Sequence, residues 1–183
     1  MKGYELNIKL ENFATDISRV LIVPNTLSFI DLIMSFRLIF DFSSFHQDYF
    51  KFPGLNLQMM DLGKVSANDI IDYNGIYIKD YFDYFRRFHW VYDLGDMWTF
   101  SVKIKNTKKA KQYPFVKSFE GKYNPCEDFY NYFEEFMYCM EHDIPLSESF
   151  VENISYMDLE GSFESSLVEF NKDNINEKLK SLI

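Results

Sequence analysis

The sequence predicts an α+β fold, in which helices pack on a mainly antiparallel sheet. Segments near the amino terminus and around residue 95 alternate apolar and polar residues, the pattern of half-buried strands. Residues 28–42 and 126–140 instead repeat apolar side chains at helical spacing. The 183 residues contain no internal repeat, low-complexity run or long linker, so residues 1–183 are expected to form a single domain.

The first three elements follow from local patterns. Tyr4–Phe13 places its apolar residues on one face, which predicts a half-buried strand. Ile17–Val23 predicts a second strand, and the short link between the two favours a hairpin. Ser28 and Asp31 fit a capping box that opens a helix ending near Phe42. Apolar residues fall on more than one face of this helix, so it is expected to be buried on two sides.

The later elements have weaker signals. Pro53-Gly54 ends one strand, and the Asn74-Gly75 pair indicates a turn. The expected elements are strands over Phe45–Phe52, Phe88–Tyr92 and Met97–Ile104, a short helix over Ser66–Ile71, and helices over Cys126–Met140 and Asn171–Leu182.

The charge of the chain is acidic, with 28 acidic against 19 basic residues and a formal net charge of −9. This balance disfavours nucleic acid as a partner, because phosphate binding draws mainly on Lys and Arg. Nucleic acid remains an alternative partner because one stretch of the chain holds several lysines and no acidic residue. Arg86 and Arg87 lie on the same expected hairpin. The lysines of this stretch are Lys103, Lys105, Lys108, Lys109, Lys111 and Lys117.

The two cysteines, Cys126 and Cys139, are too few for a zinc motif or a disulfide scaffold and are expected to be reduced. The first ten residues lack the apolar core of a signal peptide. The most apolar helix candidate, Leu27–Phe42, is shorter than the roughly 20 residues that span a bilayer. The sequence therefore predicts a soluble, cytoplasmic protein without a membrane segment.

The stretch YDLGDMW, residues 92–98, joins two expected strands and contains a turn. A two-residue loop would split the bulky side chains between the two faces of the sheet, an unfavourable register. A three-residue loop, Asp93–Gly95, pairs Trp90 with Trp98 and keeps every bulky side chain on one face. The same loop places Gly95 where a type I turn plus bulge needs a left-handed residue. We therefore expect the three-residue loop.

The two carboxylates at this turn, Asp93 and Asp96, differ in how well turn chemistry explains them. Asp93 is a favoured turn residue that can hydrogen-bond its own backbone. Asp96 fits less well, because the expected register places it opposite Tyr92 on the aromatic face. An unpaired buried carboxylate is costly, so Asp96 needs solvent, a partner such as Arg19 or Lys122, or a ligand or metal ion.

The hairpin WVYDLGDMW resembles the Y-D-F-G-D-x-W signature of the plasmid pRiA4b ORF-3-like family, which includes a passenger protein of an insertion element. Other segments follow the order found in that family: Ser18–Pro24 resembles its W-R-x-x-x-V-P strand, Phe45-His46 lies near its H-x-F strand, Tyr113-Pro114 and Gly121–Asp128 resemble its Y-P…G…C-P-P-E-D segment, and Phe170–Leu179 resembles its closing helix. The resemblance covers most of the chain, and the hairpin is its most specific part.

Some family positions are replaced in this chain. The C-P-P-E-D-C-G-G stretch of the family becomes Asn124–Asn131, without its cysteines and glycines, so a role resting on those cysteines does not carry over. The matching positions are Asp93, Gly95, Asp96, Trp98, Pro125, Glu127 and Asp128. The family has no established biochemical activity, so the resemblance implies a plasmid or mobile-element context and no mechanism.

The first functional hypothesis is a binding or accessory module without a cofactor. An aromatic surface edged by carboxylates could hold a basic peptide or a cationic ligand, which makes a protein or peptide the expected partner. The alternative is that the aromatic side chains are simply core. The candidate binding residues are Tyr92, Asp93, Asp96, Trp98, Glu127 and Asp128.

Two other hypotheses remain open. A metal-dependent or acid/base enzyme would use these carboxylates with His46, although Glu127 and Asp128 also suit a helix N-terminus. A nucleic-acid accessory factor would use the basic stretch to contact phosphates. The sequence has no Gly-rich phosphate loop, G-x-S-x-G elbow or H-E-x-x-H helix, so it assigns no catalytic residue and no metal ligand and favours a protein that is not an enzyme.

Overall fold

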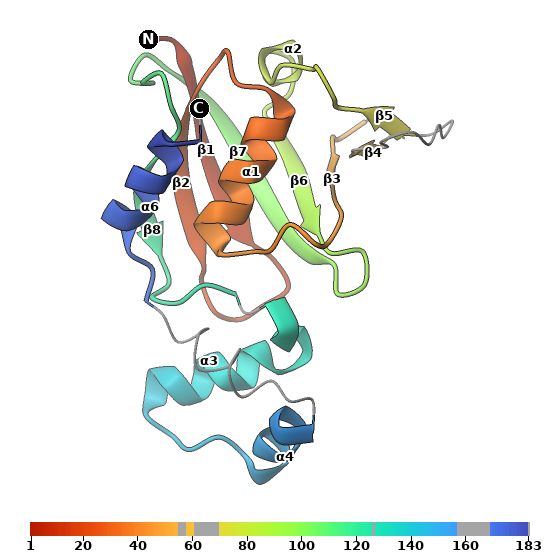
Figure 1. The fold of residues 1–183 in the computed structure, drawn as a ribbon, viewed down its shortest axis with the longest axis vertical. Helices are drawn as coiled ribbons and strands as arrows, with labels where there is room; N and C mark the ends of the chain where they lie inside the picture. Colours follow the sequence, from red (N-terminus) through yellow and green to blue (C-terminus); the bar gives the residue numbers. More distant parts are fainter. Residues whose placement is uncertain (55–57, 61–69, 126, 157–168, 183) are drawn as a thin grey trace.

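An eight-stranded sheet forms the centre of the chain, which we describe from a computed structural model (Figure 1). The structure describes residues 1–54, 58–60, 70–125, 127–156 and 169–182, without the side chains of 58, 128, 129 and 154–156. The strand order is β5-β4-β3-β6-β7-β1-β2-β8, and every neighbouring pair is antiparallel except β4 and β5. This arrangement confirms the predicted α+β fold with a mainly antiparallel sheet.

The strands are β1 (Gly3–Leu10), β2 (Ser18–Pro24), β3 (Asp48–Lys51), β4 (Gln58–Met60), β5 (Ile70–Asp72), β6 (Arg87–Tyr92), β7 (Trp98–Thr107) and β8 (Phe115–Glu120). The helices are α1 (Phe29–Phe40), α2 (Lys79–Phe82), a 3-10 helix η1 (Glu127–Tyr132), α3 (Phe133–His142), α4 (Glu148–Tyr156) and α6 (Lys172–Lys180). Helices α1 and α6 lie on the same face of the sheet, whereas α3 and α4 lie beyond one of its ends (Figure 1).

Several expected elements are present with their expected signals. The β1–β2 hairpin forms, with Leu6 paired to Leu21 at its centre. Helix α1 starts at a complete capping box, in which the Ser28 hydroxyl accepts a hydrogen bond from the Asp31 N–H and the Asp31 carboxylate accepts one from the Ser28 N–H. Helix α6 starts after Asn171, whose side chain caps it. These starts are fixed by local hydrogen bonds, which explains why the sequence predicts them well.

Other expectations are wrong in detail. Strand β3 begins at Asp48 rather than Phe45, whose side chain is 92% exposed. Ile70 and Ile71 belong to β5 instead of a helix, and residues 66–69 lie outside the described part. The expected helix over 126–140 opens as the 3-10 helix η1, and residue 126 is not described. The sequence patterns did not indicate β4, β8, α2 or α4, which are short or carry few buried residues.

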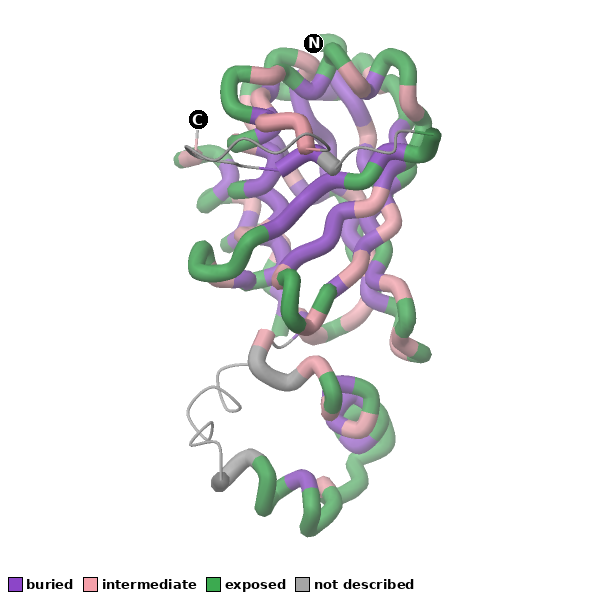
Figure 2. Tube along the Cα trace, turned by 90° about the vertical axis from the view of Figure 1, so that its right-hand side faces the viewer, coloured by how far each residue is buried: buried purple, intermediate pink, exposed green. Residues whose placement is uncertain are grey.

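The core lies between the sheet and α1. Side chains alternate along each strand, so Trp90 and Phe100 meet as cross-strand partners on the face that α1 covers. Phe36 and Phe40 of α1 pack on the Trp90 ring, at centroid distances of 5.1 and 6.0 Å. The buried residues concentrate in the sheet and α1, while the part carrying α3 and α4 is more exposed (Figure 2). No helix in the described ranges is long and apolar enough to cross a membrane.

The β8 edge of the sheet is closed by a side chain of α6. The Asn176 amide accepts a hydrogen bond from the Val116 N–H at 2.6 Å and donates one to the Val116 carbonyl at 3.2 Å, as a ninth strand would. We expect Asn176→Ala to lower the free energy of unfolding by about 1–2 kcal/mol, because it strands two partly buried backbone groups. Urea unfolding measures this, and Glu177→Ala, at an exposed position of α6, should leave the value nearly unchanged.

Candidate functional site

The β6–β7 loop is longer than the sequence predicts. Tyr92 pairs with Trp98, which leaves five residues, 93–97, in the loop. The Met97 N–H donates to the Asp93 carbonyl at 2.8 Å, and both residues have a positive φ of 59°. Gly95 does not adopt the left-handed conformation that we expected of it. The observed ladder pairs are Tyr92 with Trp98, Trp90 with Phe100, and Phe88 with Val102.

Each side chain of the hairpin strands still lies on its predicted face of the sheet, despite this error in register. The loop contains two more residues than predicted, and a shift by two residues keeps every side chain on its face. The turn chemistry of Asp93 is as expected, since its carboxylate accepts a hydrogen bond from the Gly95 N–H at 2.8 Å. Asp96 lies in the loop rather than opposite Tyr92. The predicted position of its carboxylate on the aromatic face is therefore wrong.

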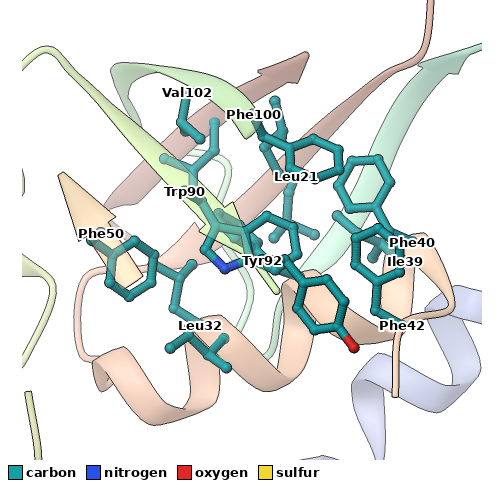
Figure 3. Close-up of a cluster of buried hydrophobic side chains, with 14 of the residues drawn as sticks. Leu21, Leu32, Ile39, Phe40, Phe42, Phe50, Trp90, Tyr92, Phe100 and Val102 are labelled. Carbon is teal, nitrogen blue, oxygen red and sulfur yellow. The ribbon is translucent and has the colours of Figure 1, made fainter. Parts of the chain in front are cut away.

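The aromatic residues of the hairpin are core. Tyr92 and Trp98 are fully buried, so they cannot form the aromatic surface of the proposed groove. The Tyr92 ring stacks on Phe42 at 4.2 Å, and the Trp98 ring stacks on Phe13 at 5.2 Å. These rings bury a large apolar area at this end of the sheet. The alternative that we stated, in which the aromatic side chains are simply core, therefore describes them. The Tyr92 hydroxyl, at the rim of this apolar cluster (Figure 3), reaches polar groups, as does the indole N–H of Trp90.

Three titratable side chains meet at that rim. Nδ1 of His46 lies 3.3 Å from a carboxylate oxygen of Asp93, and its Nε2 lies 3.3 Å from a carboxylate oxygen of Glu127. The two carboxylates are mostly buried, whereas the His46 side chain is 44% exposed. A protonated imidazole therefore forms an ion pair on both sides, and we call these three residues the His46 cluster.

Backbone pairing brings the cluster together. Strand β3 pairs with β6, so Asp48 stands opposite Tyr92, and the Asp93 N–H donates to the Gln47 carbonyl at 3.0 Å. This pairing sets His46, two residues before β3, beside the start of the β6–β7 loop. Glu127 is the first residue of η1, at which a helix favours negative charge.

The Glu127 carboxylate is held by hydrogen bonds. The hydroxyls of Tyr92 and Ser43 both donate to Oε1, the latter at 2.8 Å, and the Ser43 N–H donates to Oε2 at 2.8 Å. Burial raises the pKa of Tyr92, and the hydrogen bond to Glu127 raises it further, so the hydroxyl stays protonated at neutral pH. Glu127 is therefore fixed in place by donors while its charge faces His46.

A second ion pair lies behind the cluster. Arg37 of α1 binds both oxygens of Asp48, at 3.1 and 3.0 Å, and the Trp90 indole N–H donates to the same carboxylate at 3.2 Å. Burial raises the pKa of Asp48, while Arg37 and the Trp90 hydrogen bond act in the opposite direction. Arg37 also donates to the His46 carbonyl at 3.0 Å, which ties the loop to the helix.

A surface pocket of about 290 Å³ opens between α1 and the loop that carries His46. Arg37 and Asp48 line it on the inner side, and Ile30, Met34 and Phe45 line it with apolar surface that is 39, 44 and 92% exposed. Exposed apolar side chains gathered around polar groups are typical of a binding site.

The geometry does not match nucleophilic catalysis. A serine nucleophile needs an imidazole nitrogen within hydrogen-bond reach, but both nitrogens of His46 face carboxylates and the Ser43 hydroxyl donates to Glu127. Within the described ranges, no group of three His, Cys, Asp or Glu side chains has the arrangement of a metal site.

The structure thus brings together part of the predicted set. Tyr92, Asp93 and Glu127 meet at His46, and Trp98 and Asp96 lie outside the cluster. The side chain of Asp128 is not described. No sequence pattern indicates the additional residues Ser43, Arg37 and Asp48, because their roles depend on the β3–β6 pairing.

Comparison with known proteins identifies the family. The family model described as plasmid pRiA4b ORF-3-like protein matches residues 2–172. The chain belongs to this family. A crystal structure of the protein of unknown function MM3350 from Methanosarcina mazei Go1 is similar to this pRiA4b ORF-3-like chain, with a TM-score of 0.66 and 20% identity over 85% of this chain and 89% of that one. At this identity the likeness shows the fold alone, and no curated protein matches the chain.

Proposed function

We propose that this pRiA4b ORF-3-like protein is a binding module whose pocket beside His46 takes a cationic side chain, with an adjoining apolar residue, from a partner protein or peptide. The observation that carries the proposal is the pocket itself, in which exposed apolar side chains adjoin Asp48, Arg37 and His46. The His46 imidazole in turn contacts the Asp93 and Glu127 carboxylates, which lie next to the pocket's lining. No cofactor and no reaction are part of this function.

The charges around the pocket favour a cation. Asp48 pairs with the Arg37 guanidinium, while Asp93 and Glu127 flank the His46 imidazole, so three carboxylates lie near two basic groups. The local charge is therefore negative whether or not His46 is protonated. An anionic ligand approaching His46 would meet both of its carboxylate neighbours first, which disfavours such a ligand.

The apolar part of the pocket supplies the second half of the recognition. Ile30 and Met34 lie one helical turn apart on α1, and Phe45 faces them from the loop. The Phe45 ring is 92% exposed in the free protein, so covering it with a partner removes a large apolar area from water. Aromatic and Met side chains are also the types enriched at protein interfaces.

Isothermal titration calorimetry tests this function with an acetylated, amidated peptide of alternating lysine and leucine. We expect saturable binding to the wild-type chain and none for the peptide in which glutamate replaces lysine. Phe45→Ser and Asp93→Asn should each weaken binding about fivefold, which corresponds to about 1 kcal/mol. Asn retains the side-chain oxygen that accepts from Gly95, so the Asp93→Asn loop should keep its turn.

Matched controls separate the pocket from the net charge of −9. Tyr84→Ser removes another ring, 82% exposed, and Asp80→Asn removes another exposed carboxylate, both away from the pocket. Both variants should bind as the wild-type chain does. Unchanged affinity in Phe45→Ser, or an absence of saturable binding to the wild-type chain, contradicts the proposed function.

A further inference from the structure

The face of the sheet opposite α1 and α6, which we call the open face, carries a group of unpaired cations. The register places Lys51 on β3, Arg87 on β6, and Lys103 and Lys105 on β7 on this face, and all four are exposed. No helix in the described ranges packs against the open face. We call these four residues the cationic track.

The track is continuous across neighbouring strands. Arg87 and Lys103 are direct cross-strand partners, with β-carbons about 5 Å apart in such a pair. Lys103 and Lys105 are alternate residues of one strand, about 6.7 Å apart along it. Lys51 pairs with His89, two residues from Arg87 on the same face. The four side chains therefore present several positive charges at short, regular spacing.

None of these four cations forms a close ion pair with a carboxylate among the described residues, although Lys105 stands opposite Glu5 in the β1–β7 ladder. On the same face Glu5 is held by Lys117 at 2.8 Å, and Asp16 by Lys9. The Arg87–Lys103 pair places like charges directly opposite each other, which destabilises a sheet. Residues 97–119 contain six lysines and no acidic residue, although the chain as a whole carries a net charge of −9. The cationic track is thus a local cluster of positive charge on an acidic protein.

We propose that the cationic track binds the phosphate backbone of double-stranded nucleic acid. A duplex carries one negative charge per about 1.7 Å of its axis, so one duplex can contact all four cations at once. Single strands gain much of their affinity from stacking on aromatic rings. On β3, β6 and β7 the aromatic side chains of the open face are Tyr49, which is 7% exposed, and His89, whose Nε2 lies 3.5 Å from a Glu11 carboxylate oxygen, so the face favours backbone contacts over stacking.

This second surface goes beyond the proposed function, because it lies across the sheet from the His46 pocket. It binds an anionic ligand, whereas the pocket binds a cationic one. The acidic remainder of the chain keeps the binding weak and dependent on low salt. Binding without contacts to base edges carries no sequence preference, so any duplex serves as a probe.

Fluorescence anisotropy of a labelled DNA duplex of about 20 base pairs, between about 50 and 200 mM salt, tests the proposal. Four neutralised phosphates give a slope of log affinity against log salt of about −3.6, since each contributes about 0.9. In the double variant Arg87→Gln, Lys103→Gln we expect a slope near −1.8 and an affinity lower on the order of tenfold at the low-salt end.

The matched control is Lys79→Gln with Lys178→Gln, at exposed positions on α2 and α6. Both double variants change the net charge from −9 to −11, so a loss confined to the first one locates the binding on the track. Removing the facing like charges should leave the thermal midpoint equal to or above that of the wild-type chain, which excludes unfolding as the cause.

Several outcomes overturn the proposal. The first is that the wild-type chain does not bind the duplex at about 50 mM salt. The second is that the two double variants bind it equally well, and the third is that a single strand binds more tightly than the duplex. Displacement of the duplex by polyglutamate of equal charge would assign the track to acidic proteins instead. Phe45→Ser and Asp93→Asn should leave duplex binding unchanged, so this proposal and the His46 pocket fail or succeed separately.

Discussion

Replacing Arg19 by alanine is expected to lower the free energy of unfolding by about 3–5 kcal/mol. Arg19 is fully buried, and burial lowers its pKa to about 9, so the side chain is still a cation at pH 7. Its guanidinium donates to the Ser18 and Asn124 oxygens at 2.8 Å and to the Glu120 carbonyl, and it lies 4.1 Å from the centre of the Phe170 ring. Alanine leaves these partly buried acceptors without the arginine donor and opens a cavity, and urea unfolding measures the loss.

Two further variants show what the guanidinium contributes. Arg19→Met fills much of the volume but supplies no donor, so it should recover only part of the loss. Arg86→Ala, an exposed arginine with one hydrogen bond to the Phe82 carbonyl, should change the stability by less than about 1 kcal/mol. Full recovery in Arg19→Met would show that volume alone matters, in contradiction to the hydrogen-bonding account.

Replacing Trp98 by alanine is expected to cost about 3–5 kcal/mol, the usual range for a large buried aromatic side chain. The ring is fully buried among Phe13, Tyr130 and Phe133, whose centroids lie within 5.4 Å. Urea unfolding followed by circular dichroism avoids the loss of the indole signal. A cost below about 1 kcal/mol would mean that the ring is not core and would restore it as a surface residue.

The phenylalanine variants of the two tryptophans give a sharper comparison. The indole N–H of Trp98 is buried without a described hydrogen-bond partner, whereas that of Trp90 donates to Asp48. Trp98→Phe removes an unsatisfied group, and Trp90→Phe removes a donor from a buried carboxylate. We therefore expect Trp90→Phe to destabilise the protein more, by about 1–3 kcal/mol. The reverse order would contradict these hydrogen-bond assignments.

The parts of the fold that the sequence predicted well depend on neighbouring residues. The capping box at Ser28, the β1–β2 hairpin and the Asn171 cap all arise within a few positions. The loop length at residues 93–97 could not be chosen in the same way, because three-residue and five-residue loops leave every side chain on the same face. The positive φ of Met97, a residue type that rarely adopts it, has no signature in the sequence.

The candidate site was harder to predict because its members are distant in sequence. Asp93 and Glu127 are separated in the sequence by the whole of β7 and β8, and only the folded sheet places both beside His46. Tyr92 and Trp98 were candidates because aromatic residues near carboxylates suggest a groove. Their burial shows that a hydrophobic pattern on a strand indicates core before it indicates a ligand.

The most direct test of this account is an NMR titration of the ¹⁵N-labelled chain with the lysine–leucine peptide. Our account assigns cation binding to the pocket between α1 and the His46 loop. It predicts saturable shifts in the amides of residues 30–34, 44–48 and 93–97, with the amides of the cationic track unchanged. Shifts confined to the open face, or no saturable shift anywhere, would contradict it.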